Sequence, residues 1–204
     1  MPTPSPRYPF LLLALVVTAF AWSAIAPKEY FTWALEVLPA VLGIVLLMAT
    51  RRRFPLTNLL YTLIALHMLV LIVGGHYTYA EVPLFDWIRD TFHQSRNNYD
   101  RPAHFMQGFV PAILAREILI RSSPLKGSRW LPFLVVCICL AFSACYELFE
   151  WQTSIWTGSG GDAFLGTQGD IWDTQKDMAM ALLGAVTAVC TLGKWHDREL
   201  GKLK

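Results

Sequence analysis

The chain has 204 residues, of which 54% are hydrophobic and only 16% are charged, and its formal net charge is +2. Soluble domains carry roughly 25% charged residues, so this composition and the long apolar runs indicate an integral membrane protein. The chain lacks a basic stripe with interleaved aromatic residues, which argues against nucleic-acid binding. Its four cysteines form no CxxC pair, so they predict neither a zinc site nor a disulfide framework.

Six apolar segments are long enough, or nearly so, to cross a bilayer, which takes about 20 helical residues. They predict an all-α, polytopic membrane fold: one integral membrane domain over 1–204 with about six transmembrane helices. The first segment is expected to stay as an uncleaved anchor, because Pro27 would directly follow the signal-like Ala24-Ile25-Ala26 pattern. The expected spans are 9–26, 30–49, 56–74, 103–120, 130–150 and 176–193.

Two longer outer loops are predicted, near 75–101 and 151–175. In the first, Val82–Ile88 is apolar enough to form a short amphipathic helix at the membrane interface. The second is rich in glycine but lacks the lysine of a Walker motif. Its backbone either contacts a ligand closely or is simply flexible, and the sequence leaves both open. Its glycines are Gly158, Gly160, Gly161, Gly166 and Gly169.

The distribution of lysine and arginine predicts the orientation in the membrane. Short basic loops at 50–55 and 121–129 indicate cytoplasmic connections, which places both termini in the cytoplasm. Eleven of the 17 basic residues would then be cytoplasmic: Arg7, Arg51, Arg52, Arg53, Arg121, Lys126, Arg129, Lys194, Arg198, Lys202 and Lys204.

Ionisable residues gather at the outer ends of the predicted spans. Such groups are costly at membrane depth and normally face a protein interior or a water-filled cavity, so they are candidates for a functional site. The inner ends are expected to lack a comparable cluster, and His196 is expected to face solvent. Residues three or four apart share a helix face, as do Asp100, His104 and Gln107, then Glu147 and Glu150, then Asp173 and Asp177; His76 follows the third span.

These residues permit two kinds of chemistry. His104 could act as a general base oriented by Asp100, with Glu147 and Glu150 as an acid–base pair. Alternatively, a divalent metal could be bound by oxygen and imidazole ligands. Arginine side chains suit phosphate binding. The metal set would be His104, Glu147, Glu150, Asp173 and Asp177, and the substrate contacts would be Arg101, Arg96, His76 and Gln107.

Purely structural roles are the alternative for several of these side chains. Asp100 and Asp173 could cap the starts of their helices, with Asp177 completing the second cap. Glu150 could reach water at the membrane surface. His104 could be a buried histidine whose hydrogen bonds are simply satisfied.

Four stretches together resemble the YjdF family of bacterial inner-membrane proteins: His76–Tyr79, Asn98–Phe105, Glu147–Trp151 and Gln168–Met178. This resemblance implies the inner-membrane location and the six-helix layout, but it implies no activity. A looser similarity is to VanZ-like membrane proteins, which carry an acid, a basic residue, His-Phe, a glutamate and a further acid in this order. The matching positions are Asp100, Arg101, His104, Phe105, Glu147 and Asp173 or Asp177. That similarity implies chemistry on lipid headgroups or lipid-linked cell-wall precursors.

Three functions remain open from the sequence. The first is an enzyme acting on a phospholipid or polyprenyl-phosphate headgroup at the periplasmic face. The second is a carrier or channel for ions or small solutes. The third is a non-catalytic assembly or sensing protein that binds a partner through the outer loops. The lipid bilayer is the expected environment in each case, and the sequence leaves the oligomeric state open.

Overall fold

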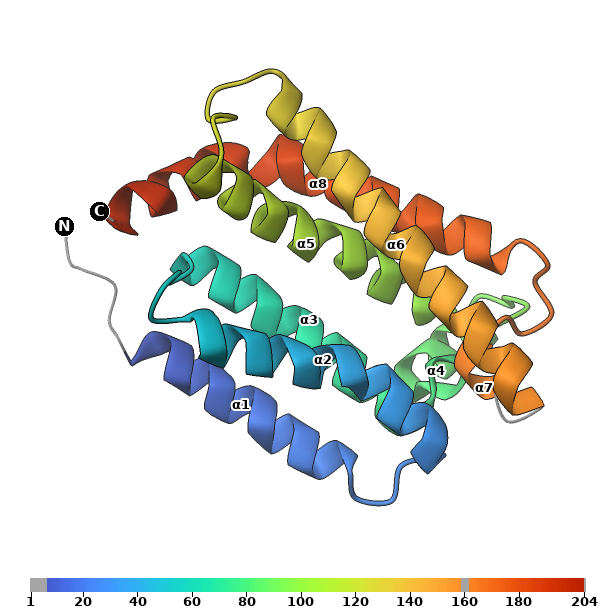
Figure 1. Ribbon diagram of the computed structural model, residues 1–204. Coiled ribbons are helices and arrows are strands. Elements are labelled where there is room, and N and C mark those ends of the chain that lie inside the picture. Colours follow the sequence, from blue (N-terminus) through green and yellow to red (C-terminus); the bar gives the residue numbers. More distant parts are fainter. Residues whose placement is uncertain (1–6, 159–161, 204) are drawn as a thin grey trace.

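The computed structural model describes residues 7–158 and 162–203, and the elements assigned within them are helical (Figure 1). The all-α prediction is therefore confirmed. Gly160 and Gly161 of the second predicted loop lie outside the described residues. The long helices are α1 (Tyr8–Ser23), α2 (Tyr30–Thr50), α3 (Asn58–Tyr77), α5 (Asp100–Ser122), α6 (Trp130–Thr157) and α8 (Asp173–Leu200). The short ones are η1 (Tyr79–Glu81), α4 (Pro83–Thr91), α7 (Asp162–Leu165) and η3 (Gly201–Leu203).

Four of the described helices are long and apolar enough to cross a membrane, namely α2, α3, α6 and α8 together with η3. Helix α1 is apolar but has only 16 residues, and α5 has 23 residues but carries charged side chains at both ends. Large apolar side chains are exposed on the outer surface, as a lipid environment favours. Among them are Leu11, Leu42, Leu46, Phe133 and Leu183. The polytopic architecture is supported, and the number of six spans stays a prediction.

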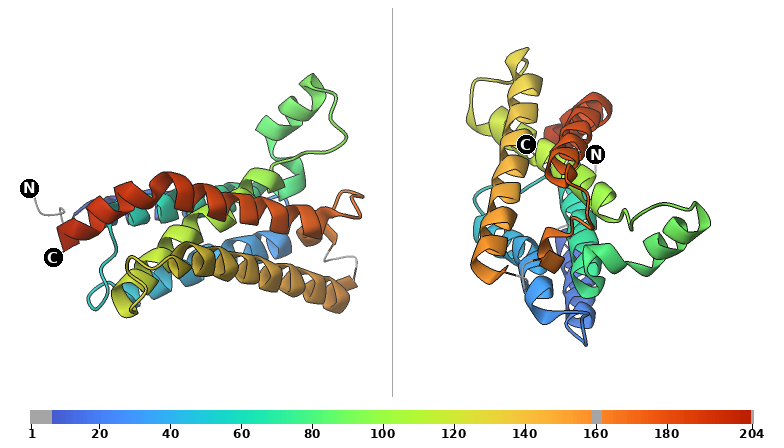
Figure 2. Two further views of the ribbon diagram at one scale, coloured as in Figure 1. Left: turned by 90° about the horizontal axis from the view of Figure 1, so that it is seen from above. Right: turned by 90° about the vertical axis from the view of Figure 1, so that its right-hand side faces the viewer.

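The long helices form two groups that run along a common direction (Figure 1). One group holds α1, α2 and α3, the other holds α5, α6 and α8, and α3 packs against α5. The start of α1 and the end of α8 lie at the same end of the bundle, together with Arg51–Arg53; we call this the basic end. The opposite end, where α5 and α8 begin, is the site end. Helix α4 projects sideways from the bundle (Figure 2), and the helix predicted in the first loop is thus present.

Helices α5 and α8 approach each other so closely that their backbones touch. A Cβ atom on Gly108 would lie 1.8 Å from the carbonyl oxygen of Ala181, and a Cβ on Gly184 would lie 2.0 Å from that of Phe105. Small residues allow this kind of close helix packing inside membranes. The contact holds the first turns of α5 and α8 side by side, and those turns carry the candidate site.

The helices extend beyond several of the predicted spans. Helix α5 begins at Asp100 instead of 103, α8 begins at Asp173 instead of 176, and α6 continues to Thr157. The N-cap residues Tyr99 and Trp172 make no side-chain cap, so Asp100 and Asp173 are first-turn residues and not the caps considered above. Carboxylates in a first turn interact favourably with the positive end of the helix dipole, which helps these turns to form.

Candidate functional site

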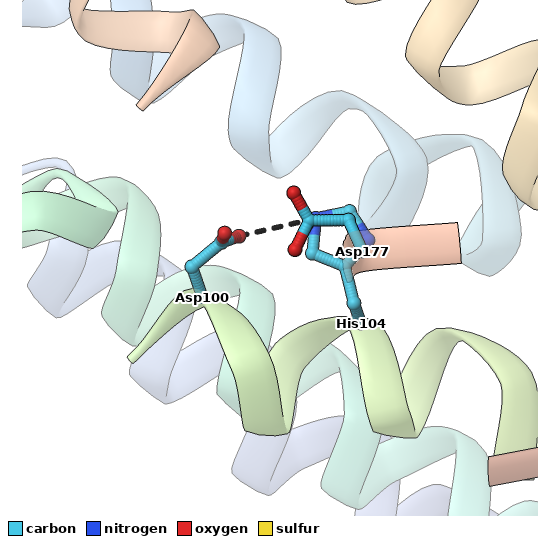
Figure 3. Close-up of side chains that lie close together, drawn as sticks. All are labelled: Asp100, His104 and Asp177. Atoms are coloured by element: carbon cyan, nitrogen blue, oxygen red, sulfur yellow. Dashed lines mark ion pairs between the residues drawn. The ribbon is translucent and has the colours of Figure 1, made fainter. Parts of the chain in front are cut away.

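The predicted acidic residues and His104 come together at the site end from three helices. Asp100 and His104 lie on α5, Glu147 and Glu150 on α6, and Asp173 and Asp177 on α8, and each is at most 7% exposed. Figure 3 shows Asp100, His104 and Asp177 pointing toward one another across the α5–α8 contact. These residues thus share one buried interior, as their spacing in the sequence leads one to expect.

The His104 ring has Asp100 and Asp177 on its Nε2 side and Glu147 on its Nδ1 side. Its Nε2 atom is 3.1 Å from Asp100 Oδ1 and 3.9 Å from Asp177 Oδ1. Its Nδ1 atom faces Glu147 Oε1 at 3.7 Å, too long for a hydrogen bond, and both of these buried atoms lack a partner. If the neutral ring donates Nε2–H to Asp100, Nδ1 carries the lone pair. His104 then presents a free basic nitrogen to the Glu147 carboxyl group.

Two arginines neutralise the aspartates at the start of α8. Nη1 of Arg96 and Nη2 of Arg101 each donate to Asp173 Oδ1 at 2.5 Å. Arg101 also donates to Asp177, while its contact with Asp170 is longer, at 3.4 Å. The predicted phosphate-binding arginines are thus already paired with carboxylates. An anionic ligand would have to compete for them, and the contact of Arg101 with Asp170 is longer than its contacts with Asp173 and Asp177.

Hydrogen bonds join the loop before α5 to the segment before α8. Arg96 donates to the carbonyl oxygens of Thr167 and Gly166, and the side chain of Gln168 bonds both the backbone N–H and the carbonyl of Asn97. These contacts place the segment 166–170 over the site end.

Asp170 ends this segment and lies outside the membrane-spanning helices. Lys176 Nζ donates to its Oδ2 at 2.6 Å, and the backbone N–H of Trp172 donates to its Oδ1. The hydrogen bond from Lys176, followed by that from Trp172, holds the pKa of Asp170 below its ordinary value. Asp170 is therefore an anion near neutral pH and supports the two arginines.

A groove between α6 and α8 leads from the surface to the site. It encloses about 660 Å³ and is lined by Glu147 and Asp173 on the site side. Its outer part is lined by Leu148, Trp151 and Ile171, which are 60%, 56% and 84% exposed. The groove thus joins an exposed apolar surface to the buried carboxylates.

Asp100, His104 and Asp177 form a possible metal-binding set. Each offers one ligand atom, and these atoms lie within 4.8 Å of one another. Two carboxylates and an imidazole suit divalent cations such as Mn²⁺, Fe²⁺ or Zn²⁺. This set shares His104 and Asp177 with the predicted one and adds Asp100. Asp173 is instead held by the arginines, and Glu147 and Glu150 lie outside the set of three.

The remaining predicted residues differ in their positions. His76 bonds the carbonyl oxygen of Ser23 through Nδ1 at 3.0 Å, and its ring packs on those of Trp22 and Tyr77. These side-chain contacts are with α1 and with its own neighbour on α3. Gln107 lines a small cavity of about 60 Å³ directly beneath His104. His67 and Tyr146 line the same cavity, and polar atoms of all three (Gln107 Oε1, His67 Nε2 and Tyr146 OH) are buried without a partner.

A second polar cluster lies at the basic end, contrary to the expectation that the inner ends lack one. Glu117 and His196 are fully buried, and His196 Nε2 lies 2.9 Å from Glu117 Oε2. Thr57 donates through its hydroxyl and backbone N–H to Glu117, and Arg121 donates to it as well. The expectation that His196 faces solvent is therefore wrong. Because every carboxylate oxygen has a donor, this cluster has the character of a structural tie between α3, α5 and α8.

The fold and site together define a helical, polytopic membrane protein with a buried acid–histidine cluster at one end. Residues 8–198 match the family described as "Predicted membrane protein (DUF2238)", and the chain belongs to that family. It is 51% identical over 179 residues to "Inner membrane protein YjdF" of Escherichia coli (strain K12), which covers 88% of this chain and 86% of that protein. No solved structure matches the chain. The predicted YjdF resemblance is confirmed, whereas the VanZ-like similarity stays a prediction.

Proposed function

We propose that this chain is a membrane-embedded enzyme that acts on the headgroup of a phospholipid or a polyprenyl phosphate. One observation carries the proposal: the groove between α6 and α8 ends on Glu147, whose Oε1 faces the unpartnered Nδ1 of His104 at 3.7 Å. The exposed apolar part of the groove suits the chains of a lipid, and its buried end offers a base beside an acid. The order of residues shared with VanZ-like proteins supports the same class of substrate.

In this proposal the side chains have distinct roles. Asp100 holds the His104 ring through Nε2, so that Nδ1 can take up a proton from an attacking hydroxyl group or water. Glu147 exchanges a proton with the leaving group. Glu150 is buried three residues further on, on the same helix face, and would influence how readily the Glu147 carboxyl group binds a proton. Asp173 and Asp177 keep the arginines in place.

A phosphate group entering this acidic site needs positive charge to balance it. Arg101 would supply part of that charge if the substrate displaced Asp170 from its 3.4 Å contact. A divalent cation held by Asp100, His104 and Asp177 would supply more and would polarise a phosphoryl oxygen. His104 Nε2 can either bind the metal or donate its hydrogen to Asp100, but not both. Metal analysis of the purified protein distinguishes these two states.

Proteoliposomes made from a bacterial lipid extract test the proposal directly. Lipid headgroups and released phosphate would be followed by ³¹P NMR and mass spectrometry with wild type, His104→Ala and Glu147→Gln. We expect a headgroup change with wild type only. An unchanged lipid profile with folded wild-type protein, with and without added Mn²⁺ or Zn²⁺ and with added polyprenyl phosphate, would contradict the proposal.

A second candidate function is a carrier for protons or small solutes, favoured by the buried polar atoms beneath the site. The atoms Gln107 Oε1, His67 Nε2 and Tyr146 OH line a cavity of about 60 Å³ without protein partners. A polar cavity of this size can hold internal water, because one water molecule needs roughly 10–15 Å³ of such cavity volume. Proton or solute uptake into proteoliposomes that is abolished by Glu147→Gln, without lipid turnover, would favour the carrier over the enzyme.

We propose that the basic end faces the cytoplasm and the site end faces the periplasm, with the chain forming one integral membrane domain. Arg121 donates to the carbonyl oxygen of Pro55, close in the chain to Arg51–Arg53, and this clustering of basic residues supports the orientation. The test is labelling of a cysteine introduced at Gln94, in the exposed loop of the site end, in a variant whose four native cysteines are replaced by alanine. A membrane-impermeant reagent should label that cysteine in intact cells, and labelling only after lysis would contradict the orientation.

A further inference from the structure

An apolar pocket lies between α1, α2 and α3 at the basic end, away from the acid–histidine cluster. Its volume is about 340 Å³, within the range of about 300–1,000 Å³ typical of ligand pockets. The pocket draws its apolar lining from three helices: Leu12, Leu13 and Val16 of α1, Ile44 and Leu47 of α2, and Ala65 and Met68 of α3. Its lining shares no residue with the proposed enzyme site.

The mouth of this pocket is basic. Arg51 and Arg52 belong to its lining, and the Arg51 guanidinium lies over the Phe10 ring, 4.9 Å from the ring centroid. Neither arginine forms an ion pair with any acidic residue among those that the structure describes. Two positive charges that have no acidic partner among the described residues therefore flank an apolar opening.

The pocket opens toward the lipid-facing surface of the bundle. Phe10 and Met48 line it and are 47% and 43% exposed. Around them α1 and α2 expose further apolar side chains, among them Leu11 and Leu46. Basic residues at the end of a membrane-spanning helix attract acidic headgroups, and an apolar slot beside them accepts an acyl chain.

We propose that this pocket binds an anionic phospholipid, with one acyl chain between α1, α2 and α3 and the acidic headgroup on Arg51 and Arg52. Charge complementarity identifies the occupant, because a zwitterionic lipid brings no net negative charge to the two arginines. The site is separate from the proposed catalytic one and lies at the opposite end of the bundle. It acts as a structural lipid site that ties the start of α1 to the loop between α2 and α3.

The test uses the full chain purified in a neutral detergent. Phosphatidylglycerol or phosphatidylcholine with identical acyl chains is added, bound lipid is counted by native mass spectrometry, and the melting temperature is recorded. Wild type should retain phosphatidylglycerol in preference to phosphatidylcholine and should melt higher with it. Equal retention of the two lipids by wild type would overturn the proposal.

Matched variants locate the headgroup contact. Arg52→Gln and Arg53→Gln each remove one charge from the same tripeptide, but only Arg52 lines the pocket. Arg52→Gln should weaken binding of phosphatidylglycerol about fivefold, the effect of one basic residue near an anionic headgroup, whereas Arg53→Gln should change it little. Equal losses in both variants would show a diffuse basic surface and no defined site.

A third variant tests the acyl-chain part of the pocket. Ala65 is 5% exposed and lines the cavity, so Ala65→Leu places extra side-chain volume where the chain would lie, while both arginines stay in place. Retention of both lipids should fall at unchanged elution volume of the protein. Unchanged retention of phosphatidylglycerol would show that no chain enters the pocket. Because none of these variants touches His104 or Glu147, the outcome is independent of any lipid turnover at the site end.

Discussion

Replacing Gly184 by alanine should push α5 and α8 apart and disrupt the site that their contact assembles. A Cβ at this position would lie 2.0 Å from the carbonyl oxygen of Phe105, whereas ordinary van der Waals contact begins at 3.4 Å. The difference, 3.4 − 2.0, means that the backbones must separate by about 1.4 Å. Overpacking of this kind costs about 1–3 kcal/mol. The same displacement would lengthen the 2.5 Å contact between Arg101 and Asp173 beyond hydrogen-bonding distance.

Thermal unfolding of the purified protein in detergent measures the effect. For a chain of this size, 1 kcal/mol lowers the melting temperature by roughly 2–4 °C, so Gly184→Ala should lower it by about 2–12 °C. Gly193→Ala is the matched control, because it lies on the same helix and a Cβ there meets no atom within 4 Å. That control should be neutral or stabilising by about 0.5–1 kcal/mol, since alanine favours the helix. If Gly184→Ala melts as high as Gly193→Ala, the backbone contact between α5 and α8 is wrong.

Three further predictions concern the basic end, the outer segment and the metal set. Glu117→Ala should cost about 3–5 kcal/mol because it leaves the buried donors of Thr57 and His196, and the Arg121 guanidinium, without their partner. Glu199→Ala removes a pair with the more exposed Lys202 and should cost less, so equal melting temperatures would contradict the buried network. The pKa of Asp170 is held below its ordinary value chiefly by Lys176. Because the pKa is lower in the folded state, ionised Asp170 stabilises the fold at pH values above its unfolded pKa, and this stabilisation is lost as the pH falls through the folded pKa. Lys176→Met should therefore be less stable than wild type at neutral pH and equally stable in strong acid, and a difference that persists in strong acid would contradict this assignment. If Asp100, His104 and Asp177 bind a metal, elemental analysis after purification should find about one divalent ion per chain and much less in Asp177→Asn. Equal metal content in the two proteins would contradict metal binding by these three residues.

Much of the site could be predicted from local spacing. Asp100 and His104 are four residues apart, and Glu147 and Glu150 are three apart, so each pair shares a helix face in any helical structure. Long apolar runs between these pairs defined the helices and the end at which the pairs meet. The gathering of these residues at one end of an all-α bundle therefore followed from one sequence.

Contacts between distant segments could not be predicted in the same way. Glu117 and His196 are 79 residues apart, and neither belongs to a recognisable motif, so a buried pair was not expected at the basic end. Arg96 and Arg101 suggested phosphate binding because nothing in the sequence places Asp173 against them. The close approach at Gly108 and Gly184 depends on how two helices pack, which single glycines do not reveal.

The most direct test of the proposed function is quantitative lipid analysis of cells that lack the protein, cells that express the wild type and cells that express His104→Ala at the same level. The analysis would cover phospholipids and polyprenyl-linked precursors. The proposed enzyme predicts at least one lipid whose amount changes on deletion and returns with wild type but not with His104→Ala. If no lipid changes, or if His104→Ala restores the wild-type profile, chemistry at the His104–Glu147 pair is contradicted.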